Sequence, residues 1–252
     1  MKIICVDAGN TLLKIAVADR GKITTVASFA AGDTEKQVRY ASSLPDADAC
    51  IVSSVGIVAS ELIKALSERA FCFFELTSET PIPIQNLYDT PETLGKDRLA
   101  AVVGAHGLFP GKNVLAVDAG TALTVDFIND AGQYLGGNIS PGLQMRYRAL
   151  HDYTQRLPLE KPVDDYPFLG SSTSSAIVSG VQTGMVAEIE NYMNHFAERH
   201  PGLVTVMTGG DAFFFENKIK KPIFVESDLV FIGLTQIAEY NIKLKTVASD
   251  GA

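Results

Sequence analysis

The sequence predicts an α/β fold that is built from two similar halves. Apolar, strand-like runs alternate with segments of helical periodicity along its 252 residues. A strand that ends in Asp-Ala-Gly occurs twice, at residues 7–9 and at residues 118–120. In both places a second strand, a turn and a third strand follow, which indicates a duplicated unit. Because Asp-Gly is a common turn dipeptide, the alternative is a single doubly wound sheet with two coincidental turns.

The first half, residues 1–112, is expected to begin with two linked hairpins. Their strands are predicted at 2–7, 12–18 and 22–29, with turn residues between them. Helices and strands then alternate until a loop rich in Pro and polar residues at 77–93. The other elements predicted for this half are helices at 35–44, 58–69 and 99–108 and strands at 49–55 and 71–76.

The second half, residues 113–252, repeats this opening pattern. Its strand triplet is predicted at 114–118, 122–128 and 133–139. The small, polar residues at 246–252 predict a frayed end. The other elements predicted for this half are helices at 143–154, 173–199 and 231–240 and strands at 203–207 and 223–226.

Composition and charge limit the classes of function. A net charge of −8 and a pI near 5.0 argue against a general binder of nucleic acid or anionic membrane, but leave a local site for a small phosphorylated ligand open. No run approaches the ~18–20 apolar residues of a membrane helix, and Asp7 comes too early for a signal peptide. Cys5, Cys50 and Cys72 lie far apart in apolar surroundings, which predicts buried free thiols and neither disulfides nor a zinc site. We therefore expect a cytoplasmic protein that binds neither nucleic acid nor membrane.

The first Asp-Ala-Gly turn has the residues of a phosphate site. Asp7 ends a buried strand and should point out of the sheet, where ligands of α/β sheets bind. Gly9 permits close approach of a phosphate, and Asn10 and Thr11 add donors. Lys14 is within reach to screen phosphate charge, and the carboxylate of Asp7 suits Mg²⁺, usually held through water. Taken alone, this turn is better explained as an Asx-type turn that caps a hairpin.

The second Asp-Ala-Gly turn changes that interpretation. Two acidic turns at matching positions of duplicated halves should face one another across a cleft and hold the phosphates of a nucleotide from both sides. A third turn, at residues 208–211 (TGGD), suits close approach by adenosine or the α-phosphate, or equally is a plain strand-to-helix turn. The sequence contains no GxxxxGK[ST] segment and no HRD or DFG set, which disfavours P-loop enzymes and protein kinases. These observations predict an ATP-dependent kinase that acts on a small molecule.

The segment at residues 95–98 (GKDR) is the best candidate for binding the acceptor. Asp97 should lie in the first turn of a helix, where the helix dipole stabilises its ionised form. Arg98 beside it is a natural partner for a substrate carboxylate, which its planar guanidinium binds bidentately. A helix cap followed by a solvated arginine explains the segment equally well.

Five segments together resemble the type III pantothenate kinases of the acetate and sugar kinase/actin-like superfamily, over nearly the whole chain. Each segment is weak evidence alone, but five in the family's order and approximate spacing are specific. Asn138 and Ser140 depart from the mostly apolar and small residues expected there, which could alter phosphate or dimer contacts. The resemblance implies a duplicated actin-like (ribonuclease H-like) ATPase fold, with two similar domains flanking a nucleotide cleft. The matching segments are 7–11 (DAGNT), Tyr88 with 95–98 (GKDR), 118–122 (DAGTA), 136–142 (GGNISPG), and 169–173 (LGSST) with 176–177 (AI) and 179–180 (SG).

The resemblance also implies an activity and residue roles. The chain would use ATP to phosphorylate pantothenate to 4′-phosphopantothenate, the first step of coenzyme A biosynthesis, as a homodimer whose active site lies at the subunit interface. Asp97 would be the general base, Asp118 would bind a monovalent cation (K⁺ or NH₄⁺), and Asp7 would hold Mg²⁺ through water. The implied ATP contacts are Asp7, Ala8, Gly9, Asn10, Thr11, Leu12, Leu13, Lys14 and Thr121; the implied pantothenate contacts are Tyr88, Gly95, Lys96, Asp97 and Arg98, with Thr173 supplied by the partner subunit.

Two alternative functions remain open from the sequence. One is a kinase of the same superfold that acts on a sugar or a carboxylate, although Arg98 and the loop around Tyr88 favour an acidic substrate. The other is a non-catalytic nucleotide-binding accessory protein, because this family has relatives first described as transcriptional accessory factors. The joint presence of Asp7, Asp97 and Asp118 argues against the second alternative.

Overall fold

The computed structural model describes the backbone of residues 1–250 and the side chains of residues 1–246. It contains two compact units. The first comprises Met1–Leu108 and the chain from Asp228 onward, and the second comprises Phe109–Ser227. The division into 1–112 and 113–252 remains a prediction about the duplicated sequence, while the compact units group the last helix with the first unit.

The first unit is built on a five-stranded sheet of order β3-β2-β1-β4-β5. β1 pairs with β2 and β2 with β3 in antiparallel fashion, so the predicted strand triplet is confirmed. β4 and β5 extend the sheet in parallel on the other side of β1. The strands are β1 (Lys2–Ala8), β2 (Leu12–Asp19), β3 (Lys22–Ala30), β4 (Ala47–Ser54) and β5 (Ala70–Glu75).

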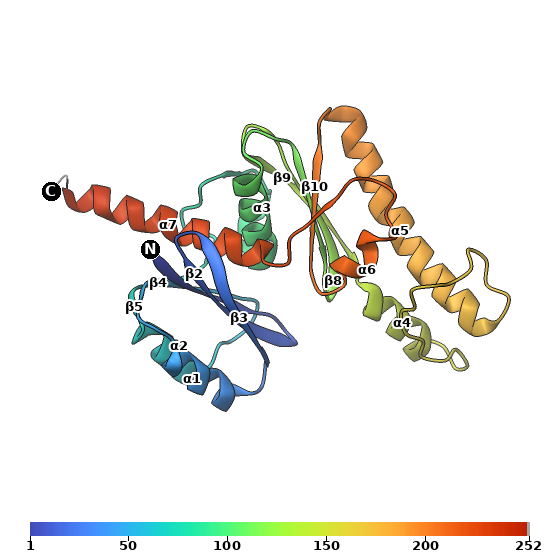
Figure 1. The fold of residues 1–252 in the computed structure, drawn as a ribbon, viewed down its shortest axis with the longest axis horizontal. Coiled ribbons are helices and arrows are strands. Elements are labelled where there is room, and N and C mark those ends of the chain that lie inside the picture. The colour runs from blue at the N-terminus through green and yellow to red at the C-terminus, as the bar shows by residue number, and fades with distance from the viewer. Residues whose placement is uncertain (251–252) are drawn as a thin grey trace. The chain divides into compact units, whose positions relative to one another are not determined.

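Helices cover both faces of this sheet (Figure 1). Apolar residues at alternate strand positions, including Ile4 and Val6, form one core with α1 (Thr34–Ser43) and α2 (Ser60–Ser67). The intervening positions, including Ile3 and Cys5, form a second core with α3 (Lys96–Leu108) and α7 (Leu229–Asp250). Burial on both faces explains why these strands are continuous apolar runs in the sequence.

α3 and α7 approach each other closely because glycine occupies their contact. A Cβ atom added to Gly104 would meet the carbonyl oxygen of Leu229, and one added to Gly233 would meet that of Ala100. α3 begins at Lys96, three residues before its predicted start. The segment predicted as a loop at 77–93 contains only β6 (Gln85–Asn86) and the 3₁₀ helix η1 (Pro91–Thr93).

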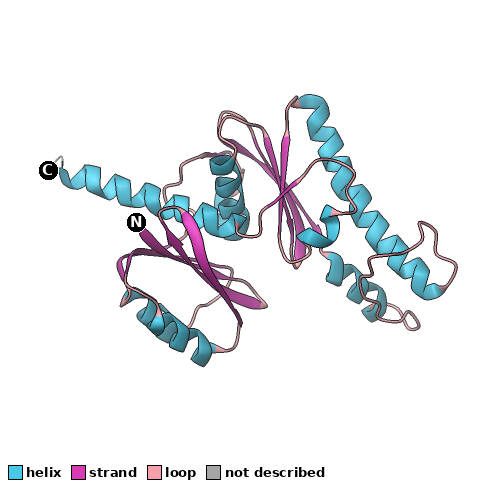
Figure 2. Cartoon of the chain, in the orientation of Figure 1, coloured by secondary structure: helices cyan, strands magenta, loops and turns pink. Residues whose placement is uncertain are grey.

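The second unit repeats the pairing pattern of the first. Its strand order is β11-β10-β7-β8-β9, so that β7 has an antiparallel neighbour in β8 and a parallel neighbour in β10, as β1 has in β2 and β4. In the core of this unit, α4, α5 and α6 pack against the sheet. Figure 2 shows the helices in cyan and the strands in magenta. The elements are β7 (Val114–Ala119), β8 (Ala122–Ile128), β9 (Gln133–Pro141), α4 (Leu143–Asp152), α5 (Thr173–Arg199), β10 (Val204–Thr208), α6 (Ala212–Glu216) and β11 (Phe224–Val225).

Three expectations from the sequence need correction. α6 was not predicted, and α7 continues through Asp250, so fraying from 246 is wrong over this stretch; residues 251–252 lie outside the described residues. Cys5 and Cys50 are buried free thiols, and burial raises the pKa of Cys5 to about 12, but Cys72 is only half-buried.

Among the described residues, no helix is long and apolar enough to cross a membrane.

Candidate active site

Asp7 stands at the carboxyl end of β1, where its face of the sheet changes from apolar to polar. In the strand register Asp7 lies opposite Lys14 on β2 and opposite Ser53 on β4. Residues opposite each other in adjacent strands project from the same face. The side chains of Asp7, Lys14 and Ser53 therefore share the face that Ile3 and Cys5 turn toward α3 and α7.

The carboxyl group of Asp7 has an unusual environment. Burial is the main cause that raises its pKa to about 6, and the nearby charge of Asp97 adds to the increase, while Lys14 acts in the opposite direction. The fold thus brings Asp7 and Asp97 close together although they come from β1 and α3. A carboxyl group whose pKa is raised by both burial and a like charge is typical of a functional site.

Asp97 is held in the first turn of α3, as predicted. Its Oδ1 accepts a hydrogen bond of 2.8 Å from the backbone N–H of Arg98. Gly95 precedes the helix, and its carbonyl oxygen accepts the first helical hydrogen bond, from the N–H of Leu99 at 3.0 Å. A Cβ atom at Gly95 would lie 2.6 Å from Oδ1 of Asp97, so glycine is required for the carboxylate to take this position.

Arg98 is a buried cation beside an aromatic ring. Its side chain is on the inner side of α3, with the residue 6% exposed, and its guanidinium carbon lies 5.5 Å from the centre of the Tyr88 ring. The backbone N–H of Tyr88 donates to Oδ1 of Asn86 at 3.0 Å, which fixes the loop locally. The alternative of a solvated arginine is therefore wrong, whereas Lys96 is half-buried.

The turn after β1 is tight. The N–H of Gly9 donates to the carbonyl oxygen of Leu12 at 3.0 Å, and a Cβ atom at Gly9 would approach the same oxygen to 3.3 Å. Asn10, Thr11 and Leu12 are exposed, whereas Leu13 points into the core with α1 and α2. Most of the predicted phosphate loop therefore lies in the paired strands β1 and β2, and Asn10 and Thr11 form the exposed turn between them.

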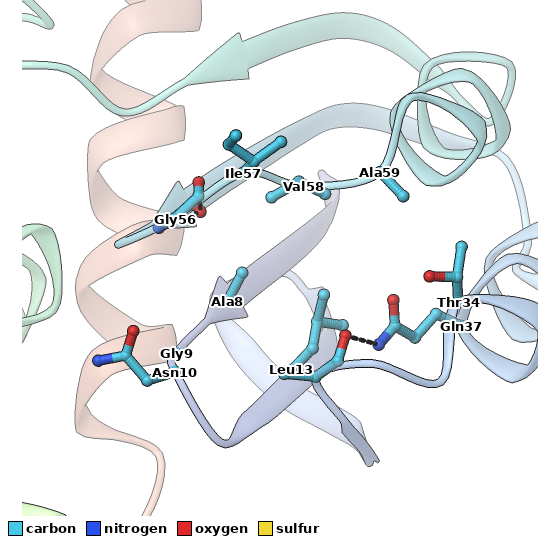
Figure 3. Close-up of a pocket in the computed structure, with 12 residues that line it drawn as sticks. Ala8, Gly9, Asn10, Leu13, Thr34, Gln37, Gly56, Ile57, Val58 and Ala59 are labelled. Atoms are coloured by element: carbon cyan, nitrogen blue, oxygen red, sulfur yellow. Dashed lines mark hydrogen bonds between the residues drawn. The ribbon is translucent and has the colours of Figure 1, made fainter.

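A cavity of about 320 Å³ lies beside this turn, on the α1–α2 side of the sheet. Figure 3 shows Gln37 on its wall, with Nε2 donating to the carbonyl oxygen of Ala31 at 3.0 Å. Nε2 also donates to the carbonyl oxygen of Ala30 at 2.8 Å. Asp7 does not line this cavity, so the cavity and the Asp7–Asp97 pair belong to opposite faces.

The corresponding turn of the second unit is built around Asp118. Asp118 ends β7 opposite Thr124 and Thr208, and its Oδ1 is buried. A Cβ atom at Gly120 would lie 2.9 Å from this oxygen, and one at Gly209, whose φ is +95°, would meet it directly. The backbone of two turns thus encloses the carboxylate of Asp118, and neither turn tolerates a side chain there. Thr121 is exposed.

The remaining motifs of this unit have local structural reasons. A Cβ atom at Gly137 would meet Oδ1 of Asp126. One at Gly142 would meet the carbonyl oxygens of residues 120 and 121, so Gly142 packs directly against the turn that follows Asp118. Ser140 donates to Oε1 of Glu188 at 2.6 Å, so its departure from the family pattern provides a polar link to α5. Thr173 is exposed as the first residue of α5, directly after the capping box of Ser172.

Two residues near these turns were missed in the sequence. Ser53 is buried beside Asp7, and a serine at the end of a predicted strand resembles an ordinary turn residue. Burial raises the pKa of Asp211 above its ordinary value, and the N–H of this residue donates to the carbonyl oxygen of Ala119 at 2.9 Å. The glycine-rich motif at 208–211 could have pointed to Asp211 as a site residue. Ser53 is revealed only by its register opposite Asp7.

The donor sets decide which ions suit these turns. The described residues contain no group of three or more His, Cys, Asp or Glu side chains placed to hold a metal. The pair Asp7 and Asp97 fits Mg²⁺ that keeps most of its water and is held by one or two carboxylates together with phosphates. The Oδ1 of Asp118 is buried, and a Cβ atom at Gly209 would meet both this oxygen and the carbonyl oxygen of Ala119. Oxygen atoms of this kind suit a hard cation.

The chain is similar to known proteins over most of its length. Residues 3–195 match the model of the family described as type III pantothenate kinase. A type III pantothenate kinase from Phocaeicola vulgatus is 42% identical over 241 residues, which cover 96% of this chain and 99% of that protein.

Two solved structures are similar in fold. A candidate Baf-family transcriptional activator from Campylobacter jejuni has a TM-score of 0.65 at 20% identity and covers 95% of this chain and 99% of its own. A candidate N-acetylmannosamine kinase from Listeria monocytogenes has a TM-score of 0.54 at 17% identity, with coverage of 96% and 100%. At these identities the likeness concerns the fold alone.

Proposed function

This chain belongs to the type III pantothenate kinase family, and from that premise we infer that it transfers the γ-phosphoryl group of ATP to pantothenate. The product is 4′-phosphopantothenate, and the reaction is the first step of coenzyme A biosynthesis. The fold is the duplicated actin-like α/β fold of ATPases and sugar kinases. A sugar kinase of the same superfold and a non-catalytic binder are not favoured, because relatives of about 40% identity over nearly the full length are named type III pantothenate kinases.

The observation that carries the assignment of roles is the pairing of Asp7 with Asp97. Phosphoryl transfer requires mainly positioning and neutralisation of charge, together with a group that takes the proton of the attacking hydroxyl. We assign that proton to Asp97, because a hydrogen bond from the Arg98 N–H to Oδ1 holds its carboxylate in the first turn of α3. Asp7 is then assigned to the phosphates of ATP, with the positive charge of Lys14 opposite it on β2 and a turn at Gly9 that carries no side chain.

Arg98 and Tyr88 are proposed to bind the acceptor. A planar guanidinium can bind a carboxylate bidentately, and pantothenate carries a carboxylate. The position of Arg98 against the Tyr88 ring limits the rotation of its planar group and so directs it. Gly95 and Lys96 are the other residues of the first unit that we propose to contact pantothenate.

Two ions are part of the proposal. Mg²⁺, held through water at Asp7, would neutralise phosphate charge when bound. Asp118 is proposed to bind a monovalent cation, K⁺ or NH₄⁺, supported by its buried carboxylate oxygen and the glycine backbones around it. The ATP contact proposed for Thr121 is supported by its exposed position in the same turn.

We also propose that the protein acts as a homodimer in the cytoplasm, with Thr173 completing the partner's pantothenate site. The segment that joins α4 to α5 exposes large apolar side chains: Tyr153 is 89% exposed, and Phe168 and Leu169 are 85% exposed. Apolar groups of this size in one segment next to Thr173 favour a protein interface there. Three free cysteines suit a reducing compartment.

The release of ADP tests the proposed function. Purified protein is mixed with ATP, Mg²⁺ and K⁺, and ADP is measured with pantothenate, with glucose, or with no acceptor. We expect ADP release to depend on pantothenate. Stimulation by the sugar alone would favour the alternative kinase, and no stimulation by any acceptor would favour the silent binder.

A further inference from the structure

Ser53 has a buried hydroxyl group for which the described part of the chain provides no hydrogen-bond partner. The residue is 1% exposed, and its Oγ makes no hydrogen bond with any described residue. Leaving a buried hydroxyl unpaired is costly, and the same space would suit alanine, which occurs on this face of β4 at Ala49. A stabilising role therefore does not explain a serine at this position.

The surroundings of Ser53 indicate what the hydroxyl is for. On β4 the residues of this face run Ala49, Ile51, Ser53, and on β1 they run Ile3, Cys5, Asp7, so both strands change from apolar to polar at the same level. Strand neighbours are about 4.8 Å apart, and a serine side chain rotates among three staggered positions. The hydroxyl can therefore reach the carboxylate on the adjacent strand by rotation of its own χ1.

We propose that Ser53 is a positioning residue for the magnesium–nucleotide, which donates a hydrogen bond to the carboxylate of Asp7 in the bound state. This inference rests on the proposed function. A carboxylate that receives a hydrogen bond from Ser53 keeps one orientation toward a hydrated cation. The charged groups near that carboxylate are Lys14 and Asp97. The hydroxyl of Ser53 would add a neutral hydrogen-bond donor to them.

Three variants separate this role from a structural one. Ser53→Ala removes only the unpaired hydroxyl. Thr235→Val is the matched control, since it removes a buried hydroxyl on the same side of the sheet that does have a partner: Oγ1 of Thr235 donates to the carbonyl oxygen of Phe231 at 2.8 Å. Ser53→Thr retains the hydroxyl and serves as the conservative variant.

The ligand-free melting temperature is the first readout. Loss of an unpaired hydroxyl should leave the Tm of Ser53→Ala unchanged or raise it by about 2–4 °C, whereas Thr235→Val should melt at a lower temperature. A Tm of Ser53→Ala that falls as in the control would show a structural role and overturn the proposal.

Nucleotide binding is the second readout, measured by calorimetry with a non-hydrolysable ATP analogue, with Mg²⁺ or with EDTA. We expect Ser53→Ala to weaken binding about tenfold in Mg²⁺ and to leave binding in EDTA unchanged, and we expect Ser53→Thr to restore most of the loss. Wild-type affinity of Ser53→Ala in Mg²⁺, or no effect of Mg²⁺ on the wild type, would overturn the proposal. If pantothenate fails as acceptor while the Mg²⁺-specific loss is found, the role of Ser53 stands and the acceptor assignment falls.

Discussion

The carboxyl groups of Asp7 and Asp97 lie close enough for the charge of Asp97 to raise the pKa of Asp7. Asp7 lies near the carboxyl end of β1, and Asp97 lies in the first turn of α3. Two like charges in a partly buried site destabilise the ligand-free protein, and a cation relieves their repulsion. This repulsion is one reason for proposing a hydrated Mg²⁺ beside Asp7.

The pH dependence of stability follows from the raised pKa of Asp7. Its pKa is about 6 in the folded protein against 3.8 ordinarily, so ionisation destabilises the fold fully above pH 6, and this effect disappears as the pH falls toward 4. Asp7→Asn should therefore raise the ligand-free unfolding free energy by about 1–3 kcal/mol at pH 7.5 and by almost nothing at pH 4. Urea denaturation at both pH values checks this. An equal change at both pH values would contradict the raised pKa.

Arg98 should determine the affinity for the acceptor. Arg98→Met preserves much of the buried stem but removes the guanidinium, so we expect KM for pantothenate to rise at least tenfold while KM for ATP changes little. Arg98→Lys should not restore it, because the ammonium group lacks the planar donor pair. The matched control is Arg39→Met at an exposed ion pair with Glu35, which should leave both constants unchanged. An unchanged KM for pantothenate in Arg98→Met would remove Arg98 from the acceptor site.

Gly95 should be intolerant of a side chain. The added methyl group of Gly95→Ala would lie 2.6 Å from Oδ1 of Asp97, so the carboxylate must move and kcat should fall by at least tenfold with little loss of stability. Gly32→Ala is the control, since no atom lies within 4 Å of the added group. Steady-state rates and melting curves of both variants test this, and a normal kcat in Gly95→Ala would mean that the position of Asp97 is not critical.

The oligomeric state should depend on the α4–α5 segment. Changing Phe168 and Leu169 together to Glu should shift the protein from dimer to monomer in sedimentation velocity and abolish activity, because the partner's Thr173 is lost from the site. Phe71→Glu, at a residue 93% exposed in the other unit, is the control and should remain dimeric. A monomeric wild type, or a double variant that is dimeric and active, would reject the proposed interface.

Local patterns were sufficient to predict most of the architecture. The apolar runs that end in Asp7 and Asp118 gave both strand triplets, because strands buried on two faces are almost wholly apolar. The helix at Thr173–Arg199 was found at its predicted ends, where Ser172 and Ser175 form a capping box. α6 was missed because it is a five-residue helix, too short for a periodic pattern.

Contacts between distant segments could not be predicted in the same way. Asp97 approaches Asp7 because Ala100 and Val103 pack α3 into the core of the sheet, and no local motif reveals that contact. The close approach of α3 to α7 at Gly104 and Gly233 is likewise a contact between distant segments. The burial of Ser53 depends on its register with Asp7 across parallel strands that are far apart in sequence. The start of α3 at Lys96 agrees with the prediction that placed Asp97 in a first helical turn, although the apolar pattern of the helix begins only at Leu99.

The central claim is that Asp97 takes the proton from the hydroxyl of pantothenate, and Asp97→Asn tests it most directly. Rapid-quench measurement of 4′-phosphopantothenate formed in a single turnover, together with calorimetric binding of a non-hydrolysable ATP analogue, separates chemistry from affinity. We expect the transfer rate of Asp97→Asn to fall at least a hundredfold while nucleotide affinity stays within about threefold of wild type. A transfer rate near that of the wild type would show that Asp97 is not the base.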